Sequence, residues 1–183
     1  MVTKTKLTKG ISLLILSMLV LLGAACGTSP TATPTPFSAP LSTPTELTPT
    51  DLERAREALS TYFSLLHAGR YSEAIEYYGG SYETLRVWNP DVDGDDYITL
   101  FERGCTANGL VCLEMGKIVD QEQVSPTEFR FVVEFVNDDG SLFVLGPCCG
   151  ETEEDMPPQS QFTVGVKKVD HGFLAQDLPV YMP

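Results

Sequence analysis

The stretch FRFVVEFV, residues 129–136, decides the fold because its side chains alternate along the chain. Phe or Val occupies every odd position, while Arg130 and Glu134 stand at even positions. A period of two residues is typical of a β-strand that buries one face against a core. Asp138-Asp139-Gly140 then supplies a turn signal, so we expect the chain to reverse directly after this strand.

Further strands are expected on both sides of this stretch. Residues 141–145 form the predicted return strand, and Phe162, Val164 and Val166 alternate in another. His171-Gly172 turns the chain into a last strand over residues 173–178, and residues 111–119 form a first strand upstream. The second half of the chain therefore predicts a meander of antiparallel strands.

A long helix is expected to begin at Asp51, because Thr50 and Glu53 have the spacing of a capping box. Gly69 is predicted to end it, since glycine is favoured just beyond a helix. The apolar residues between them recur at helical spacing and form one face. These residues are Leu52, Ala55, Leu59, Tyr62, Phe63 and Leu66.

Three shorter helices are predicted after the long one. Ser72 is expected to cap the second, which Gly79-Gly80 stops. The third covers about residues 82–87 and the fourth about residues 95–103. Because helices come first and strands follow, the pattern predicts an α+β fold with N-terminal helices packed on an antiparallel sheet.

Several phrases in residues 51–183 resemble the nuclear-transport-factor-2-like superfamily. They are ALSTYFSLLHAGRYSEAIEYY (58–78), FRFVVEFVN (129–137), FTVGVKKVD (162–170) and FLAQDLP (173–179). The resemblance implies a curved sheet that wraps around the long helix and leaves a cone-shaped pocket. Some members of that superfamily are isomerases, dehydratases or cyclases, and many others have no known catalytic role.

The first 25 residues have the three parts of a secretory signal peptide. Three lysines precede an apolar run over residues 11–22, and Gly23-Ala24-Ala25 lead to Cys26. The phrase LLGAAC resembles the lipobox of bacterial lipoproteins, although Gly23 replaces the aliphatic residue preferred there. The resemblance implies cleavage before Cys26 and acylation of that cysteine, for example with palmitate. An ordinary secretory peptide that is cut nearby is the alternative.

Composition separates the rest of the chain into a linker, residues 26–50, and a single domain, residues 51–183. Residues 27–50 contain eight Thr, six Pro and three Ser, a composition too polar to fold and favourable to an extended chain. Removal of residues 1–25 leaves 12 − 3 = 9 basic and 25 acidic residues, a net charge of −16. Such a charge excludes a nucleic-acid partner, so the predicted membrane contact is the lipid on Cys26, on the extracytoplasmic side.

Four cysteines remain in the predicted domain: Cys105, Cys112, Cys148 and Cys149. An even number outside the cytoplasm predicts structural disulfides. We favour a Cys105–Cys112 bond, because Asn108-Gly109 between them is a strong turn signal. Cys148 and Cys149 would then form a vicinal bond. In the two alternative connectivities each of them pairs with one of the first two cysteines, and the sequence does not choose among the three. The spacing fits neither a zinc site nor a Cys-x-x-Cys redox motif.

The segment DVDGDDYITLFE, residues 91–102, resembles a calcium-binding EF-hand loop. Calcium is therefore the one cofactor that the sequence suggests. Asp96 stands where the loop should have Gly, and Pro90 directly precedes it. We favour the alternative interpretation, in which these acids form a turn that caps the following helix. The calcium ligands that the resemblance implies are Asp91, Asp93, Asp95, Tyr97 and Glu102.

A catalytic constellation is not evident in the sequence. His67 and His171 stand apart from any nucleophile motif. Tyrosines and carboxylates could line a pocket of the isomerase type, but core and surface roles suit them better. Our leading hypothesis is a non-catalytic anchored domain that binds a small ligand or partner protein, and an isomerase or dehydratase is the alternative. The candidate pocket residues are Tyr62, Tyr77, Glu134 and Asp177.

Overall fold

The computed structural model describes residues 49–182. The predicted signal peptide, Cys26 and all but the end of the predicted linker lie outside the described residues. Within residues 49–182, no helix has the length and the apolar composition needed to cross a bilayer.

The long helix α1 (Asp51–His67) begins and ends where the sequence predicts. Thr50 Oγ1 accepts a hydrogen bond from the Glu53 amide at 3.2 Å, and Glu53 Oε2 accepts one from the Thr50 amide at 2.6 Å. Gly69, with φ of +68°, turns the chain away beyond the helix, a conformation that suits glycine. The face that α1 buries includes Leu59, Tyr62 and Phe63, and it forms the centre of the core.

Short helices follow α1 along the chain. They are α2 (Tyr71–Ala74), the 3-10 turn η1 (Ile75–Tyr77), α3 (Glu83–Trp88) and α4 (Tyr97–Thr106). The predicted cap at Ser72 is wrong, because the second helix begins one residue earlier, at Tyr71, and no side chain caps it. Asp96 caps α4 by accepting a hydrogen bond from the Thr99 amide at 3.1 Å, which agrees with the capping interpretation of this acidic turn.

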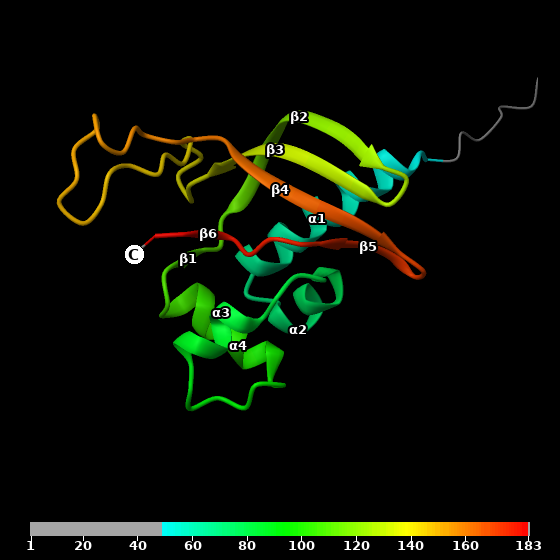
Figure 1. The fold of residues 1–183 in the computed structure, drawn as a ribbon, viewed down its shortest axis with the longest axis horizontal. Coiled ribbons are helices and arrows are strands. Elements are labelled where there is room, and N and C mark those ends of the chain that lie inside the picture. The colour runs from blue at the N-terminus through cyan, green and yellow to red at the C-terminus, as the bar shows by residue number, and fades with distance from the viewer. Residues whose placement is uncertain (1–48, 183) are drawn as a thin grey trace, which may run out of the picture. The chain divides into compact units, whose positions relative to one another are not determined.

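Four strands form an antiparallel sheet in the order β2-β3-β4-β5, which confirms the predicted α+β class. They are β2 (Glu114–Ser125), β3 (Glu128–Val136), β4 (Phe162–Val169) and β5 (Gly172–Ala175). A second, two-stranded sheet pairs β1 (Leu110–Val111) with β6 (Val180–Tyr181). Figure 1 shows the four strands curving over one side of α1, while α2, α3 and α4 gather away from that sheet.

The alternation in residues 129–136 places the two faces of β3 in different surroundings. Phe129, Phe131, Val133 and Phe135 are buried, and the Phe135 ring lies 4.8 Å from that of Phe63 on α1. Burial of each such side chain contributes about 1.5–3 kcal/mol. The opposite face carries exposed ion pairs, such as Arg130 with Glu122 at 2.5 Å. One face of the sheet therefore holds the core and the other is polar.

The predicted return strand over residues 141–145 is wrong. After the turn at Gly140, this segment makes only single bridges, Val136 with Leu142 and Leu145 with Gln159. The chain instead forms a long connection over residues 137–161, which extends from the end of the sheet in Figure 1. The strand that pairs beside β3 is β4, which comes after this connection.

Two other predicted strands are each divided. The predicted strand over residues 111–119 is split into β1 and β2, which belong to different sheets, because the chain changes sheets at residues 112–113. The predicted last strand over residues 173–178 ends as β5 at Ala175, and the chain resumes pairing as β6 at Val180. At the junction, the Gln176 backbone amide still donates a hydrogen bond to the Gly165 carbonyl at 2.9 Å. The chain then bends at Asp177, where the pairing with β4 ends.

Candidate functional site

The candidate pocket residues do not converge in one cavity. Tyr62 is fully buried, and its hydroxyl faces the main-chain carbonyl of Asp177 at 3.5 Å. Glu134 lies on the polar face of the sheet, where Lys117 contacts it at 3.1 Å and Gln161 donates to it at 3.0 Å. Tyr77 lies in η1, beside the β4–β5 hairpin. The carboxylate and tyrosine pair of an isomerase site is therefore not assembled by these four residues.

The tyrosine hydroxyls nearest the core belong to an aromatic cluster. Tyr78 stacks on Tyr62 with ring centroids 5.8 Å apart, and Phe101 meets both rings edge-on. Burial, followed by the neighbouring tyrosines, raises the pKa of Tyr62 well above its usual value. Burial also raises the pKa of Tyr82 to about 12. These phenols stay protonated at neutral pH and serve as packing groups.

The acidic segment that resembles an EF-hand loop has its carboxylates directed to different partners. Asp91 forms a two-oxygen contact with Arg103 at 2.7 and 2.8 Å, and these hydrogen bonds hold its pKa below the usual value. Asp95 lies 3.6 Å from Arg86, and Asp93 accepts the Asp95 amide at 2.9 Å. The resemblance assigns Tyr97 a backbone oxygen as its ligand, and its ring packs on that of Tyr82.

The fifth implied calcium ligand, Glu102, lies on α4 in an exposed position. Among residues 49–182, no three acidic, histidine or cysteine side chains group together as a set of metal ligands. The arrangement shows the acids engaged with arginines, backbone amides and the α4 cap.

The four cysteines fall into two separate pairs. Cys105 at the end of α4 and Cys112 after β1 are joined in a disulfide with Cα atoms 5.6 Å apart, in agreement with the pairing that the sequence favours. Gly109 between them has φ of +82° and completes the turn. Cys148 and Cys149 are free and lie in the connection between β3 and β4.

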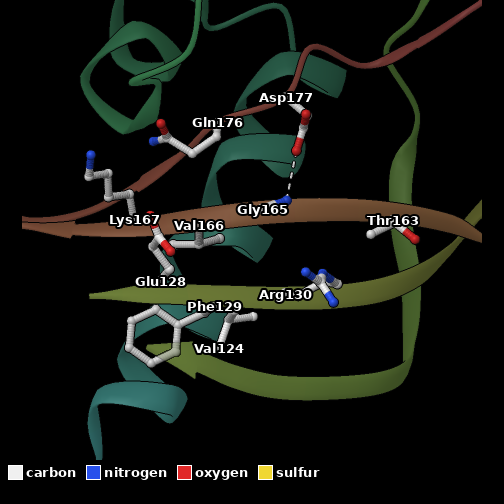
Figure 2. Close-up of a pocket in the computed structure, with 10 residues that line it drawn as sticks. All are labelled: Val124, Glu128, Phe129, Arg130, Thr163, Gly165, Val166, Lys167, Gln176 and Asp177. Atoms are coloured by element: carbon white, nitrogen blue, oxygen red, sulfur yellow. Dashed lines mark hydrogen bonds between the residues drawn. The ribbon is translucent and has the colours of Figure 1, made fainter. Parts of the chain in front are cut away.

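A hollow on the polar face of the sheet has a volume of about 390 Å³. Its floor is Gly165, whose amide donates to Asp177 Oδ2 at 2.7 Å, as Figure 2 shows. Arg130 and Thr163 lie to one side of this contact, and Lys167 and Gln176 to the other. Charged side chains of both signs line this hollow, and they are exposed to solvent. We call this the sheet-face hollow.

A second hollow of about 410 Å³ lies beside it, and most of its lining residues have apolar side chains. Buried rings of Phe63, Phe135 and Phe162 form its base. We call it the apolar hollow. Its remaining lining residues come from β4, from β6 and its approach, and from the arms of the long connection. These residues are Leu145, Gln159, Thr163, Val164, Asp177, Leu178, Val180 and Tyr181.

Asp177 lines both hollows, and it is the one carboxylate among the residues of the apolar hollow. Its Oδ2 is held by the Gly165 amide, which fixes the side chain at the boundary between the two surfaces. Small-molecule sites in proteins are mostly apolar clefts of about 300–1,000 Å³ with a few placed polar groups. By the types of its lining residues, the apolar hollow fits that description better than the sheet-face hollow, which four charged residues line.

A third hollow, about 560 Å³, lies between α1 and the β4–β5 hairpin. It is larger, and three charged side chains, Arg54, Glu57 and Glu76, stand among its lining residues. Arg54 lies over the Phe173 ring at 5.0 Å and covers its apolar part. Its walls therefore carry charges of both signs, whereas Asp177 is the one charged residue that lines the apolar hollow.

Of the four candidate pocket residues, Asp177 is the one that lines the apolar hollow. Sequence reasoning identified the three phenylalanines at its base only as core residues, from helical spacing for Phe63 and from alternation for Phe135 and Phe162. It also missed Leu178 and Val180, which lie at a break between strands. Comparison with protein-family models and with curated proteins gives no match for this chain.

Proposed function

We propose that this chain is a lipid-anchored extracytoplasmic binding module with a nuclear-transport-factor-2-like fold. The α+β order of elements and the sheet curving over α1 support that fold assignment. The lipobox-like phrase LLGAAC supports an anchor on Cys26. In this proposal the protein is non-catalytic, because the candidate tyrosines and carboxylates point to separate surroundings.

The apolar hollow is the proposed ligand site, and its lining is the observation that carries the proposal. Three phenylalanine rings form an apolar base, and Asp177 places one negative charge at the rim. A complementary ligand has an apolar body and a donor or positive charge that meets this carboxylate. We therefore propose a small amphipathic ligand, with an amine as the simplest polar group that fits.

Competition for a neutral fluorescent dye tests this site. Nile red is expected to bind the purified protein, and dodecylamine should displace it at lower concentration than dodecanoate does. A charge-assisted contact contributes about 1.5–3 kcal/mol, so the two concentrations should differ by roughly tenfold or more. Asp177→Asn keeps an acceptor for the Gly165 amide but removes the charge, and it should abolish the preference.

Two leucine substitutions, one in each hollow, test where the dye binds. Leu178→Trp is expected to fill the apolar hollow and weaken dye binding roughly tenfold, since Trp adds volume inside it. Leu174→Trp introduces the same change at the third hollow and should leave dye binding intact. Equal effects of the two substitutions, or equal displacement by amine and carboxylate, would contradict the proposal.

A further inference from the structure

The long connection between β3 and β4 carries an adjacent cysteine pair in the phrase GPCCGE, residues 146–151. The arms of the connection meet where Leu145 and Gln159 exchange two main-chain hydrogen bonds, at 2.8 and 2.9 Å. Beyond this bridge, the Glu151 amide donates to the Cys148 carbonyl at 3.0 Å and closes a tight turn. The two cysteines therefore lie within a turn beyond the bridge that closes the connection.

Their sulfur atoms are held against each other. Cys148 Sγ lies 2.7 Å from Cys149 Sγ, not far beyond the bonded distance of about 2.05 Å. Cys149 has φ of +61° and is the only residue other than glycine with positive φ in the part of the chain that the structure describes. Such backbone costs about 1–3 kcal/mol and concentrates at functional positions. The turn thus stores strain at the residue that brings the two thiols together.

We propose that Cys148 and Cys149 form a reversible vicinal disulfide that exchanges with disulfides outside the protein. Cys149 is exposed and Cys148 is half-buried, so an incoming reagent reaches the pair from solvent. This site is distinct from the Cys105–Cys112 bond and does not depend on the ligand proposed for the apolar hollow.

The exchange requires an external disulfide as the oxidant. One thiolate attacks a sulfur of that disulfide, which forms a mixed disulfide and releases the first external thiolate. The neighbouring thiolate then attacks the protein sulfur of the mixed bond, closes the ring and releases the second external thiolate. The two cysteines lose two protons and two electrons, and the external disulfide gains both as two thiols.

Adjacency makes this bond easier to reduce than an ordinary one. Neighbouring Cα atoms are about 3.8 Å apart, whereas disulfides usually span about 4.4–6.8 Å. The Cys105–Cys112 pair, at 5.6 Å, lies inside that range. Strained and exposed disulfides are the labile or regulatory ones, and unstrained ones resist reduction. The two bonds should therefore open at different reduction potentials.

The charges near the pair favour one class of reagent. Glu151, Glu153, Glu154 and Asp155 follow the cysteines directly, so a cationic disulfide is attracted and an anionic one is repelled. The hydrogen bond with Cys149, followed by burial and by the charges of Cys149 and Glu151, raises the pKa of the Cys148 thiol. We expect exchange to be faster with cystamine than with oxidised glutathione, to accelerate at alkaline pH, and to lose its charge preference in high salt.

Differential alkylation of the full chain in graded thiol buffers tests the proposal. After cystamine treatment, the peptide with residues 148 and 149 should resist alkylation and be lighter by two hydrogen atoms. As the buffer becomes more reducing, this pair should become alkylated before Cys105 and Cys112 do. Cys148→Ser should trap the cysteamine adduct on Cys149, whereas the wild-type protein resolves it and accumulates none.

A Cys105→Ser/Cys112→Ser double variant provides the control for independence and should form the same vicinal bond. Three outcomes would overturn the proposal. The pair could stay alkylated after cystamine treatment, either cysteine could be found bonded to Cys105, Cys112 or a second chain, or both disulfides could open at the same potential. Because residues 148 and 149 lie outside the core, the single variant should fold, which its melting temperature checks.

Discussion

At the residue scale, the contact between Asp91 and Arg103 shows how the acidic segment is used. The same aspartate would be the first ligand of a calcium loop, but here both of its oxygens accept from one guanidinium group. The sequence showed the acids and their spacing, whereas the position of Arg103 relative to them depends on how α4 packs. A motif of spaced carboxylates therefore does not distinguish a metal site from a network of ion pairs.

We predict that Asp91→Asn lowers the melting temperature slightly at neutral pH, with Asp93→Asn as its control. The Arg103 hydrogen bonds lower the pKa of Asp91 in the folded state. The stability they add is present above the unfolded carboxyl pKa of about 3.9 and is lost as the pH falls through the folded value. Thermal melts from pH 7 to pH 2 should therefore show the wild-type advantage disappearing in acid.

The wild-type protein and the Asp91→Asn variant also test whether the acidic segment binds calcium. Arg103 already neutralises Asp91, so millimolar calcium is expected to leave the melting temperature unchanged. A calcium-dependent rise that Asp91→Asn abolishes would contradict this expectation and restore the EF-hand interpretation.

Gly80 carries a constraint that sequence alone does not reveal. The Gly79-Gly80 pair predicts only that the second helix stops, but a Cβ at residue 80 would lie 2.1 Å from the Gln176 carbonyl oxygen. It would also lie 2.5 Å from the Tyr78 hydroxyl. The chain after η1 therefore packs directly on the backbone that follows β5, and a methyl group there forces the two apart.

We predict that Gly80→Ala destabilises the protein by about 1–3 kcal/mol, the usual cost of overpacking. Gly146→Ala is the matched control, because nothing lies within 4 Å of its added Cβ. Urea unfolding followed by circular dichroism measures both. Equal stability of the two variants would show that the contact near residue 176 relaxes without cost.

At the scale of the element, local signals predicted the helices and the central strands well. The cap at Thr50, the end near Gly69 and the alternation in β3 and β4 depend on neighbouring residues, which the sequence displays. Prediction failed where the structure depends on which segment pairs with a strand. Residues 141–145 are a short apolar run directly after a turn signal, which predicts a strand, yet β4 occupies the place beside β3.

The edge strand β2 shows the opposite failure. It continues to Ser125, six residues beyond its predicted end. Gln121 and Gln123 pair with buried residues of β3 and yet are exposed themselves. Because this half of the strand has no buried face, no apolar alternation marks it in the sequence. Hydrogen bonding to β3 alone extends the strand there.

The capping box at Thr50 gives a quantitative prediction for α1. Thr50→Ala removes the acceptor for the Glu53 amide and should cost about 1 kcal/mol in the free energy of unfolding. Thr61→Ala is the control within the same helix, since its hydroxyl only adds a second bond to the Glu57 carbonyl and Ala favours the helix. Chemical denaturation compares them, and an equal loss of stability in both would contradict the capping role.

At the scale of the whole molecule, the candidate site depends on elements that are distant in sequence. Phe63 comes from α1, Phe135 from β3, Phe162 from β4, and Val180 from β6. Each residue was identifiable as apolar, but the hollow among them arises only because β5 ends at Ala175 and the chain bends before β6. A break in pairing carries no pattern of its own, so the sequence could predict the core but not the hollow beside it.

The proposed anchor yields the last prediction, which concerns where the protein is held. Wild-type protein should incorporate an alkyne-tagged fatty acid and sediment with membranes, and Cys26→Ser should lose the label and become soluble. Cys149→Ser keeps both properties if the label is specific to the lipobox-like cysteine. A high-salt wash should not release the wild-type protein, because a mature net charge of 9 − 25 = −16 repels anionic lipid headgroups, which leaves acyl chains to hold it. Unlabelled, soluble wild-type protein would contradict the anchor and support an ordinary secretory peptide.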